Sequence, residues 1–254
     1  MNNILTISGQ RGGSGKSITA LNLSVSLSLY ERKVLLVDCD PLGCTTEWSG
    51  ISGTGFPFDL AAVLNGKATL IEAVAKTEFN FLDILPAGFD LFTSALKLSR
   101  QAANERILRL LLEEIRTDYD FIILDAPSSY GFLSIAALAA ADGLVISLCP
   151  RLNTVADIHG LLKTIRYIRQ THETPLKIAG VLFNRCLGKE EIDRFLREQN
   201  LMETRELVCS SFIPEDTAVA QSVLKRTPLA LHDVKSPACE GYLAFAREMI
   251  QSLN

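Results

Sequence analysis

Runs of apolar residues recur along the chain, and polar or charged segments separate them. The runs are rich in Ile, Leu and Val and do not alternate with polar residues. Strands that are buried on both faces of a parallel sheet show this continuous pattern, whereas a sheet with one face in water shows alternation. The pattern therefore predicts strands at residues 4–8, 33–38, 81–86, 120–125, 143–149, 177–183 and 207–213.

Helical patterns lie between these strands. Residues 16–30 carry apolar side chains at helical spacing, and residues 99–117 are amphipathic with charges on one side. Residues 153–170 begin at Asn153, a residue type that caps helices, and residues 240–254 are typical of an amphipathic helix that packs on a core. Repeated strand–helix–strand units predict an α/β fold with a doubly wound, mostly parallel sheet and helices on both faces. The pattern leaves the strand order open.

Length and composition favour one domain. The chain has 254 residues, of which 48% are hydrophobic, and this is enough for one large α/β domain with a buried core over residues 1–254. Linkers, repeats and low-complexity stretches are not visible in the sequence. The segment 50–58, which is rich in glycine, is expected to be a mobile loop.

Charge and cysteine content narrow the class of protein. The net charge of −4 gives no global attraction to nucleic acid or anionic membranes, so any such binding needs a local patch. No signal peptide is visible at the N-terminus, and no apolar run reaches the roughly 18 residues of a membrane span, so a cytoplasmic protein is expected. The cysteines lie in or beside apolar runs and are expected to be buried free thiols. They are Cys39, Cys44, Cys149, Cys186, Cys209 and Cys239.

The stretch "GQRGGSGKS" at residues 9–17 lies between a strand and a helix, where a phosphate-binding loop belongs. Its glycines allow backbone amides to turn toward phosphate oxygens, and the helix adds its positive N-terminal end. Lys16 can reach the β- and γ-phosphates, and Ser17 can ligate Mg²⁺. The alternative is a glycine-rich turn with a solvated lysine. The expected nucleotide-binding residues in this stretch are Gly12, Gly13, Ser14, Gly15, Lys16, Ser17 and Ile18.

Three aspartates follow strands. Asp38 and Asp40 end or follow the run 33–38, and Asp125 ends the run 120–125. Ligands of open α/β sheets bind at the carboxyl ends of strands, and a P-loop enzyme places a carboxylate near its Mg²⁺ in this way. Each aspartate alone could be a helix cap or a turn residue. Their common position predicts a metal site with Ser17, Asp38 and Asp125.

Several segments resemble, in the same order, blocks of the ParA/MinD family of P-loop ATPases, whose Walker A box is deviant. They are "QRGGSGKS", "KVLLVDCDPLG", "LDILPAGFDL", "YDFIILDAPSSYG", "KIAGVLFNR" and "VKSPACEGY". The resemblance covers nearly the whole chain and is greatest to short ParA/Soj-like partition ATPases. The family box has no glycine where Gln10 stands. Leu42 differs from the family's frequent Gln, and Arg11 occupies the position of its signature lysine.

The resemblance implies ATP and Mg²⁺ as cofactors and three catalytic residues. Lys16 and Arg11 would offset charge on the transferred phosphoryl group, and Asp40 would orient the attacking water. In relatives the signature lysine reaches the nucleotide of the partner subunit, so Arg11 is expected to do so, unless it is only a solvated residue. Asn184 matches the residue that pairs with adenine, or is a turn residue, and Pro214 lies where the family's backbone meets the base.

The functional expectation is a positioning ATPase that partitions plasmids, chromosomes or other cargo. As an ATP-bound homodimer it would bind DNA nonspecifically near the nucleoid, and a ParB-like or other adaptor would stimulate hydrolysis. A MinD-like membrane ATPase is disfavoured because no polybasic tail follows the last helix. A metabolic enzyme on the same fold (a carboxylase, reductase or pump subunit) is disfavoured because paired cysteines and further polar clusters are missing.

Basic residues gather in the C-terminal half and are candidates for a DNA-binding patch, although solvated helix faces look the same. They are Lys163, Arg166, Arg169, Arg185, Lys189, Arg194, Arg197, Lys225 and Arg226.

Overall fold

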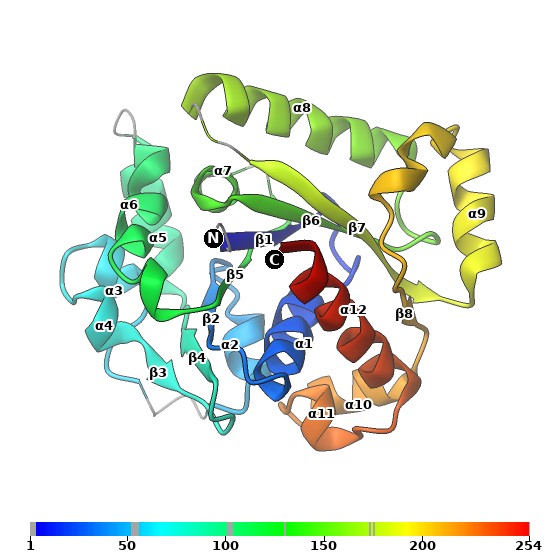
Figure 1. Ribbon diagram of the computed structural model, residues 1–254. Coiled ribbons are helices and arrows are strands. Elements are labelled where there is room, and N and C mark those ends of the chain that lie inside the picture. The colour runs from blue at the N-terminus through cyan, green and yellow to red at the C-terminus, as the bar shows by residue number, and fades with distance from the viewer. Residues whose placement is uncertain are drawn as a thin grey trace.

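The computed structural model describes residues 4–51, 56–100, 104–129, 131–172, 174 and 176–253. In this part of the chain one sheet has the strand order β3-β4-β2-β5-β1-β6-β7-β8 (Figure 1). All neighbouring strands are parallel except β3 and β4. The strands are β1 (Ile4–Ser8), β2 (Val34–Asp38), β3 (Ala75–Lys76), β4 (Leu82–Leu85), β5 (Phe121–Asp125), β6 (Gly143–Leu148), β7 (Lys177–Cys186) and β8 (Ile213–Pro214).

Helices cover both faces of the sheet (Figure 1). They are α1 (Lys16–Leu29), α2 (Cys44–Trp48), α3 (Leu60–Leu64), α4 (Leu70–Ala73), α5 (Asp90–Leu98), α6 (Ile107–Glu113), α7 (Phe132–Ala140), α8 (Val155–His172), α9 (Lys189–Glu198), α10 (Thr217–Leu224), α11 (Leu229–His232) and α12 (Pro237–Leu253). In the described ranges, 3₁₀ turns accompany them at Asn104–Arg106, Arg116–Asp118 and Met202–Leu207. The doubly wound α/β fold predicted from the sequence is confirmed.

Each face of the sheet has its own core. Successive residues of a strand enter different cores: Ile122 packs with residues of α7 and α8, and Ile123 packs with residues of α1 and α12. Tyr242 and Phe245 of α12 are fully buried in the second core. Because both faces are covered, every position of β5 must be apolar until the strand reaches its carboxyl end.

The strand predicted at 207–213 is wrong over most of its length, and only Ile213 belongs to a strand, β8. The backbone amides of Ser210 and Ser211 donate to the carboxylate of Glu248 on α12, at 2.8 and 3.0 Å. Val208 makes one isolated bridge to Val181. These amides are satisfied by a side chain, so the segment does not need a ladder of strand hydrogen bonds.

The predicted helix at 99–117 is wrong as a single helix. It falls into a 3₁₀ turn, α6 and a second 3₁₀ turn, and residues 101–103 lie outside the described part of the chain. α5 ends at Leu98, whose carbonyl accepts a hydrogen bond from Asn104 Nδ2 at 3.3 Å.

The predicted helix cap at Asn153 is also wrong. Its Oδ1 accepts a hydrogen bond from the backbone amide of Cys149, and α8 begins two residues after Asn153. Residues 52–55 of the expected mobile loop are not described.

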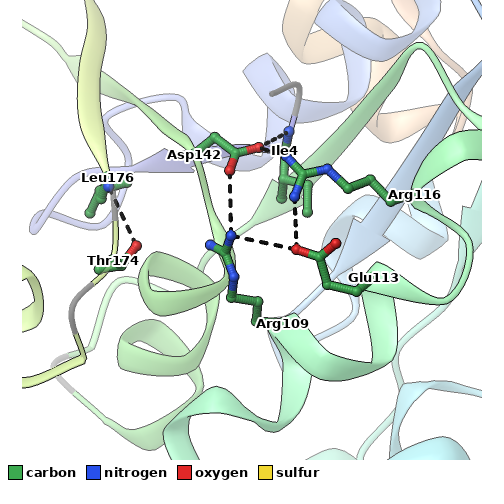
Figure 2. A network of polar contacts seen from close by, with 7 residues as sticks. All are labelled: Ile4, Arg109, Glu113, Arg116, Asp142, Thr174 and Leu176. Carbon is green, nitrogen blue, oxygen red and sulfur yellow. Dashed lines mark hydrogen bonds and ion pairs between the residues drawn. The ribbon is translucent and has the colours of Figure 1, made fainter. Parts of the chain in front are cut away.

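A polar network ties the amino ends of β1 and β6 to α6 (Figure 2). Asp142 precedes β6 and is 7% exposed. Its Oδ2 accepts from the backbone amide of Ile4 at 3.1 Å and from Arg116 Nη2 at 2.6 Å. Its Oδ1 lies 3.8 Å from Arg109 Nη2, and Glu113 pairs with both arginines. The network lies at the sheet edge opposite the carboxyl ends of the strands.

All six cysteines are unpaired, and five of them are buried, which confirms the expected free thiols. Cys44 is the half-buried one. Burial raises the pKa of Cys186 and Cys209 to about 12, so these thiols stay protonated. None of the helices in the described ranges is long and apolar enough to cross a membrane.

Candidate nucleotide site

The loop between β1 and α1 approaches neighbouring chain segments so closely that only glycine fits at two positions. A Cβ atom on Gly9 would lie 2.6 Å from the carbonyl oxygen of Ser147. Gly15 has a φ of 92°, and its Cβ would lie 2.9 Å from the side chain of Asn184. α1 begins directly afterwards, so its first backbone amides face the loop and provide an anion-binding helix end.

A series of buried hydrogen bonds connects this loop to β6, β7 and α12. Ser147 Oγ donates to the carbonyl oxygen of Ser14 at 2.7 Å and accepts from Asn184 Nδ2 at 3.0 Å. Asn184 Oδ1 accepts from Thr19 at 3.3 Å and from Tyr242 at 3.4 Å. Asn184 is 2% exposed, so the structure places its amide as a support of the loop. An amide nitrogen carries two hydrogens, and the bond to Ser147 uses one of them.

Pro214 lies beside Asn184. In the pairing of β7 with β8, Asn184 is opposite Ile213, and Cys186 is opposite Pro214. The two residues expected near a nucleotide base therefore come from neighbouring strands, although thirty residues of sequence separate them along the chain. The structure brings both to the same edge of the sheet as the phosphate loop.

Asp38 and Asp125 lie directly opposite each other at the ends of β2 and β5, and both are fully buried. Burial raises the pKa of Asp38 to about 6, against hydrogen bonds that lower it. Its Oδ2 accepts from the amide and hydroxyl of Thr46 at 2.9 and 2.8 Å, and its Oδ1 accepts from the amide of Asp40 at 3.0 Å. Asp38 is thus held rigidly by the segment that follows its own strand.

Asp125 is less well satisfied. Burial, and then repulsion by Asp38, raise its pKa to about 7, while the nearby hydroxyls of Thr45 and Ser17 lower it. Its Oδ2 accepts from Thr45 Oγ1 at 2.5 Å, but its buried Oδ1 has no hydrogen-bond partner among the described residues. An unpartnered buried carboxylate oxygen beside a serine hydroxyl suits a hard divalent cation.

No group of three or more His, Cys, Asp or Glu side chains in the described ranges could hold a metal alone. A cation at Ser17 and Asp125 would therefore need further oxygen ligands. Mg²⁺ is commonly bound in this way, by one or two protein groups together with phosphate oxygens and water.

Lys16 lies inside the loop. Its side chain is nearly buried, and its Nζ donates to the carbonyl oxygen of Arg11 at 3.0 Å. Burial lowers the pKa of Lys16, and attraction to Asp125 and Asp40 opposes this effect. The two carboxylates favour the charged form of Lys16, and an ammonium in the loop can bind a phosphate oxygen.

Asp40 is half-buried and follows the end of β2. Its Oδ1 accepts from the backbone amide of Leu42 at 3.0 Å. It also lines a cavity of about 660 Å³, together with Pro41, Pro127, Phe132 and other mainly apolar residues. Asp40 therefore lies in the wall of a cavity that is large enough for water and a solute.

Arg11 points out of the loop. Its side chain is 49% exposed, and its Nε lies 3.2 Å from Asp157 Oδ2 in the first turn of α8. The structure thus brings Lys16, Ser17, Asp38, Asp40 and Asp125 together and places the guanidinium of Arg11 outside this group.

Sequence reasoning missed the residues that hold the site in position, because no local pattern marks them. They are Thr45, Thr46, Ser147 and Asp157.

A glycine-rich loop before a helix, a buried lysine and strand-end aspartates define a P-loop nucleotide-binding protein. A family model described as "AAA domain" matches residues 2–178. The chain is 33% identical over 248 residues to the chromosome partitioning protein ParA of Myxococcus xanthus, covering 98% of this chain and 88% of ParA. It is 31% identical to the sporulation initiation inhibitor protein Soj of Bacillus subtilis, covering 98% of each. The chain belongs to the ParA/MinD family of P-loop ATPases.

Solved structures agree with this fold. The cobyrinic acid a,c-diamide synthase of Mycobacterium smegmatis with bound ATP analog and magnesium is 28% identical, has a TM-score of 0.80 and covers 97% of this chain and 93% of its own. The cell division ATPase MinD of Pyrococcus furiosus is 24% identical, has a TM-score of 0.80 and covers all of both chains. The second likeness shows the fold alone.

Proposed function

We propose that this ATPase binds Mg²⁺-ATP in the loop at residues 9–17 and acts as a positioning ATPase of the partition type. The proposal rests on the different positions of two cationic side chains. Lys16 lies inside the loop, whereas the guanidinium of Arg11 lies outside it and is half exposed. A cation outside its own phosphate site is available to a second subunit. The active form would therefore be a homodimer.

The described residues fit the metal and the phosphates. Ser17, Asp38 and Asp125 would hold Mg²⁺, directly or through water, and the unpartnered Oδ1 of Asp125 supports this. When bound, the ion would neutralise charge on the β- and γ-phosphates. The amides of Gly12, Gly13, Ser14, Gly15, Lys16, Ser17 and Ile18 would cradle the phosphates.

The protein's own groups would then promote in-line attack by water. Asp40 would orient the water, because it is half-buried and lines a cavity together with Pro127, which follows the strand of Asp125. Lys16 would offset charge on its own nucleotide, and Arg11 would offset charge on the nucleotide of the partner. Asn184 would use its second Nδ2 hydrogen for the adenine edge, next to the backbone at Pro214.

The partition role is supported by the ParA and Soj relatives, which match the chain over nearly its whole length. We propose nonspecific DNA binding by the ATP-bound dimer, a nucleoid location, and stimulation by a ParB-like or other adaptor. The basic residues do not form one patch: α8 and α10 lie on opposite sides of the sheet (Figure 1). Lys163 and Arg166 are exposed on α8, whereas Arg226, after α10, pairs with Glu47 at 2.8 Å.

The test is retention on random duplex DNA with and without ATP. ATP should raise the affinity, and salt should lower it steeply because phosphate contacts release counterions. Lys16→Ala should remove the ATP effect, and Asp40→Ala should keep ATP binding and DNA retention but stop turnover. Two double charge reversals, Lys163→Glu with Arg166→Glu and Lys225→Glu with Arg226→Glu, identify which face binds. No retention of ATP-loaded protein at low salt would refute the DNA role.

A second candidate is an ATP-dependent synthase, because structures of such an enzyme match the fold at 26–28% identity. The apolar cavity beside Asp40 would then receive the acceptor substrate. In that case turnover would require a small-molecule acid and would not respond to DNA or to an adaptor protein.

A further inference from the structure

Gln10 has a buried polar group for which the proposed chemistry has no use. The residue lies between β1 and Arg11 in the phosphate loop. Its Nε2 atom is inaccessible to solvent and has no hydrogen-bond partner among the described residues. A buried amide donor without an acceptor is unfavourable, so such groups in folded proteins are normally satisfied, often by an ordered water.

A small cavity lies against Gln10. It has a volume of about 20 Å³, and its walls include Ser134 of α7 and Thr164 of α8. A cavity needs roughly 10–15 Å³ and two or more polar partners to hold one water. The size of this cavity therefore corresponds to one water molecule.

Ser134 and Thr164 in the cavity wall carry hydroxyl groups that can accept hydrogen bonds. Ser134 Oγ donates to the carbonyl oxygen of Pro127 at 3.1 Å and also to that of Ser129. Thr164 Oγ1 donates to the carbonyl oxygen of Gly160 at 3.2 Å. Each hydroxyl has its hydrogen engaged and keeps lone pairs that accept. The residues that line the cavity thus include one with an unpartnered donor, Gln10, and two with acceptor lone pairs, Ser134 and Thr164.

We propose that this cavity binds one water, which accepts from Gln10 Nε2 and donates to Ser134 Oγ and Thr164 Oγ1. Gln10 is then a positioning residue, which connects the phosphate loop to α8 and to the segment 127–129 that follows Asp125. α8 holds the next loop residue too, because Asp157 pairs with Arg11 and lies two turns before Thr164 on the same side of the helix. The loop would thereby contact α8 at two consecutive residues, through the proposed water at Gln10 and through the ion pair of Arg11.

The water is tested without nucleotide, so this part does not depend on the proposed function. In a high-resolution crystal structure we expect one ordered water between Gln10, Ser134 and Thr164. It should be absent from Gln10→Met, which keeps the size of the side chain and removes its donors. Hydrogen exchange at the amides of Ser128 and Ser129 should be faster in Gln10→Met than in wild type. A dry cavity, or unchanged exchange at both amides, would overturn the proposal.

The kinetic part rests on the proposed roles of Arg11 and Asp125. Loss of a group that orients site residues commonly costs roughly tenfold or more, so Gln10→Met should lower kcat about tenfold and leave KM unchanged. Thr164→Val should have a similar effect, and the double variant should be no worse than the more damaged single variant. Thr171→Val, on the same helix but outside the cavity, is the control. Additive losses in the double variant, or a loss in the control as large as in Thr164→Val, would refute coupling through a shared water.

Discussion

Arg11 Nε lies 3.2 Å from Asp157 Oδ2, while the carbonyl oxygen of the same arginine accepts a hydrogen bond from Lys16 Nζ. The backbone of Arg11 therefore belongs to the phosphate loop, and its side chain is bound to α8 of its own subunit. To reach a second subunit, the guanidinium must leave Asp157. Exposed ion pairs are weak, with about 0.2–1 kcal/mol each, so this exchange costs little.

If Arg11 acts in the partner's site, Arg11→Ala should weaken ATP-dependent dimerisation and slow hydrolysis, and the affinity of the monomer for ATP should stay nearly unchanged. Arg11→Lys should restore part of both, because it keeps the charge and loses the planar fork. Sedimentation of the ATP-bound protein and steady-state hydrolysis measure the two effects.

A mixing experiment separates action in the partner's site from action in the residue's own site. An Arg11→Ala subunit keeps an intact Lys16, and a Lys16→Ala subunit keeps an intact Arg11. Mixing the slow Arg11→Ala variant with the inactive Lys16→Ala variant should recover some turnover, since the second can supply Arg11 to the first. If mixing recovers nothing and Arg11→Ala alone dimerises normally, Arg11 is only a solvated loop residue.

Asp157→Asn should favour the dimer. The amide cannot form the ion pair with Arg11, but it can still accept the hydrogen bond that Asp157 Oδ2 receives from the backbone amide of Thr154 at 2.8 Å. Each of the two subunits breaks one such pair, so we expect ATP-dependent dimerisation to tighten by up to about fivefold per pair and about thirtyfold for the dimer, at the upper end for exposed pairs. Unchanged or weaker assembly, with a normal thermal midpoint, would contradict a competing role of Asp157.

Stability should depend on pH through the two buried aspartates. The pKa values of Asp38 and Asp125 are raised from 3.8 to about 6 and about 7, so the folded protein holds protons that the unfolded chain has lost. The stabilisation of the folded state by these protonated carboxyl groups is fully present below pH 3.8. It is lost as the pH rises through about 7, where the folded protein also releases these protons. Asp125→Asn should therefore raise the thermal midpoint of the nucleotide-free protein more at about pH 8 than at about pH 5.

Mg²⁺ with nucleotide should reverse this dependence, because metal binding requires deprotonated carboxylates. Its stabilising effect should grow between about pH 5 and about pH 8 in the wild type, and less so in Asp125→Asn. Equal stabilisation of both proteins across this range would place the metal away from Asp125.

Asp142→Asn should destabilise the fold without changing nucleotide affinity. The substitution removes one of the two carboxylates that Arg109 and Arg116 share, and it leaves these two partly buried arginines with the carboxylate of Glu113 (Figure 2). We expect a loss of about 2 kcal/mol in the free energy of unfolding, less than for a fully buried pair because both arginines retain some exposure. Lys76→Met is the matched control, because its ion pair with Asp83 is exposed at the lysine and should be worth about 0.5 kcal/mol.

Much of this protein could be predicted from sequence alone, because the signals are local. The segments 4–8 and 120–125 are predicted as strands because their interior residues, apart from Thr6, are apolar until Ser8 or Asp125 ends the strand. The phosphate loop was found because glycines, Lys16 and Ser17 stand together at a strand–helix junction. Two-faced burial and a tight anion-binding turn each require particular residues at consecutive positions, so both leave a pattern in the sequence.

The failures concern segments whose state depends on distant partners. Residues 207–213 are as apolar as a strand, but Glu248 binds their amides. The segment 99–117 has the charge pattern of a helix, but α5 ends at Leu98, just before it. The segment itself forms a 3₁₀ turn, α6 and a second 3₁₀ turn instead of one helix. The periodicity of apolar residues shows which face of a helix or strand is apolar. It contains no information on which groups form hydrogen bonds with the backbone amides and carbonyls.

Tertiary structure alone decided the strand order and the partners of the site residues. Asp38 and Asp125 are opposite each other because β2 and β5 are neighbours, although 87 positions separate the two residues in the sequence. Asn184 supports the phosphate loop across 165 positions, through Thr19, and Asp157 holds Arg11 from another helix. The chain's residues determined that a phosphate loop and strand-end carboxylates exist. Packing of the sheet determined which of them meet, because hydrogen bonds and ion pairs depend on distances of a few ångströms that no spacing along the chain specifies.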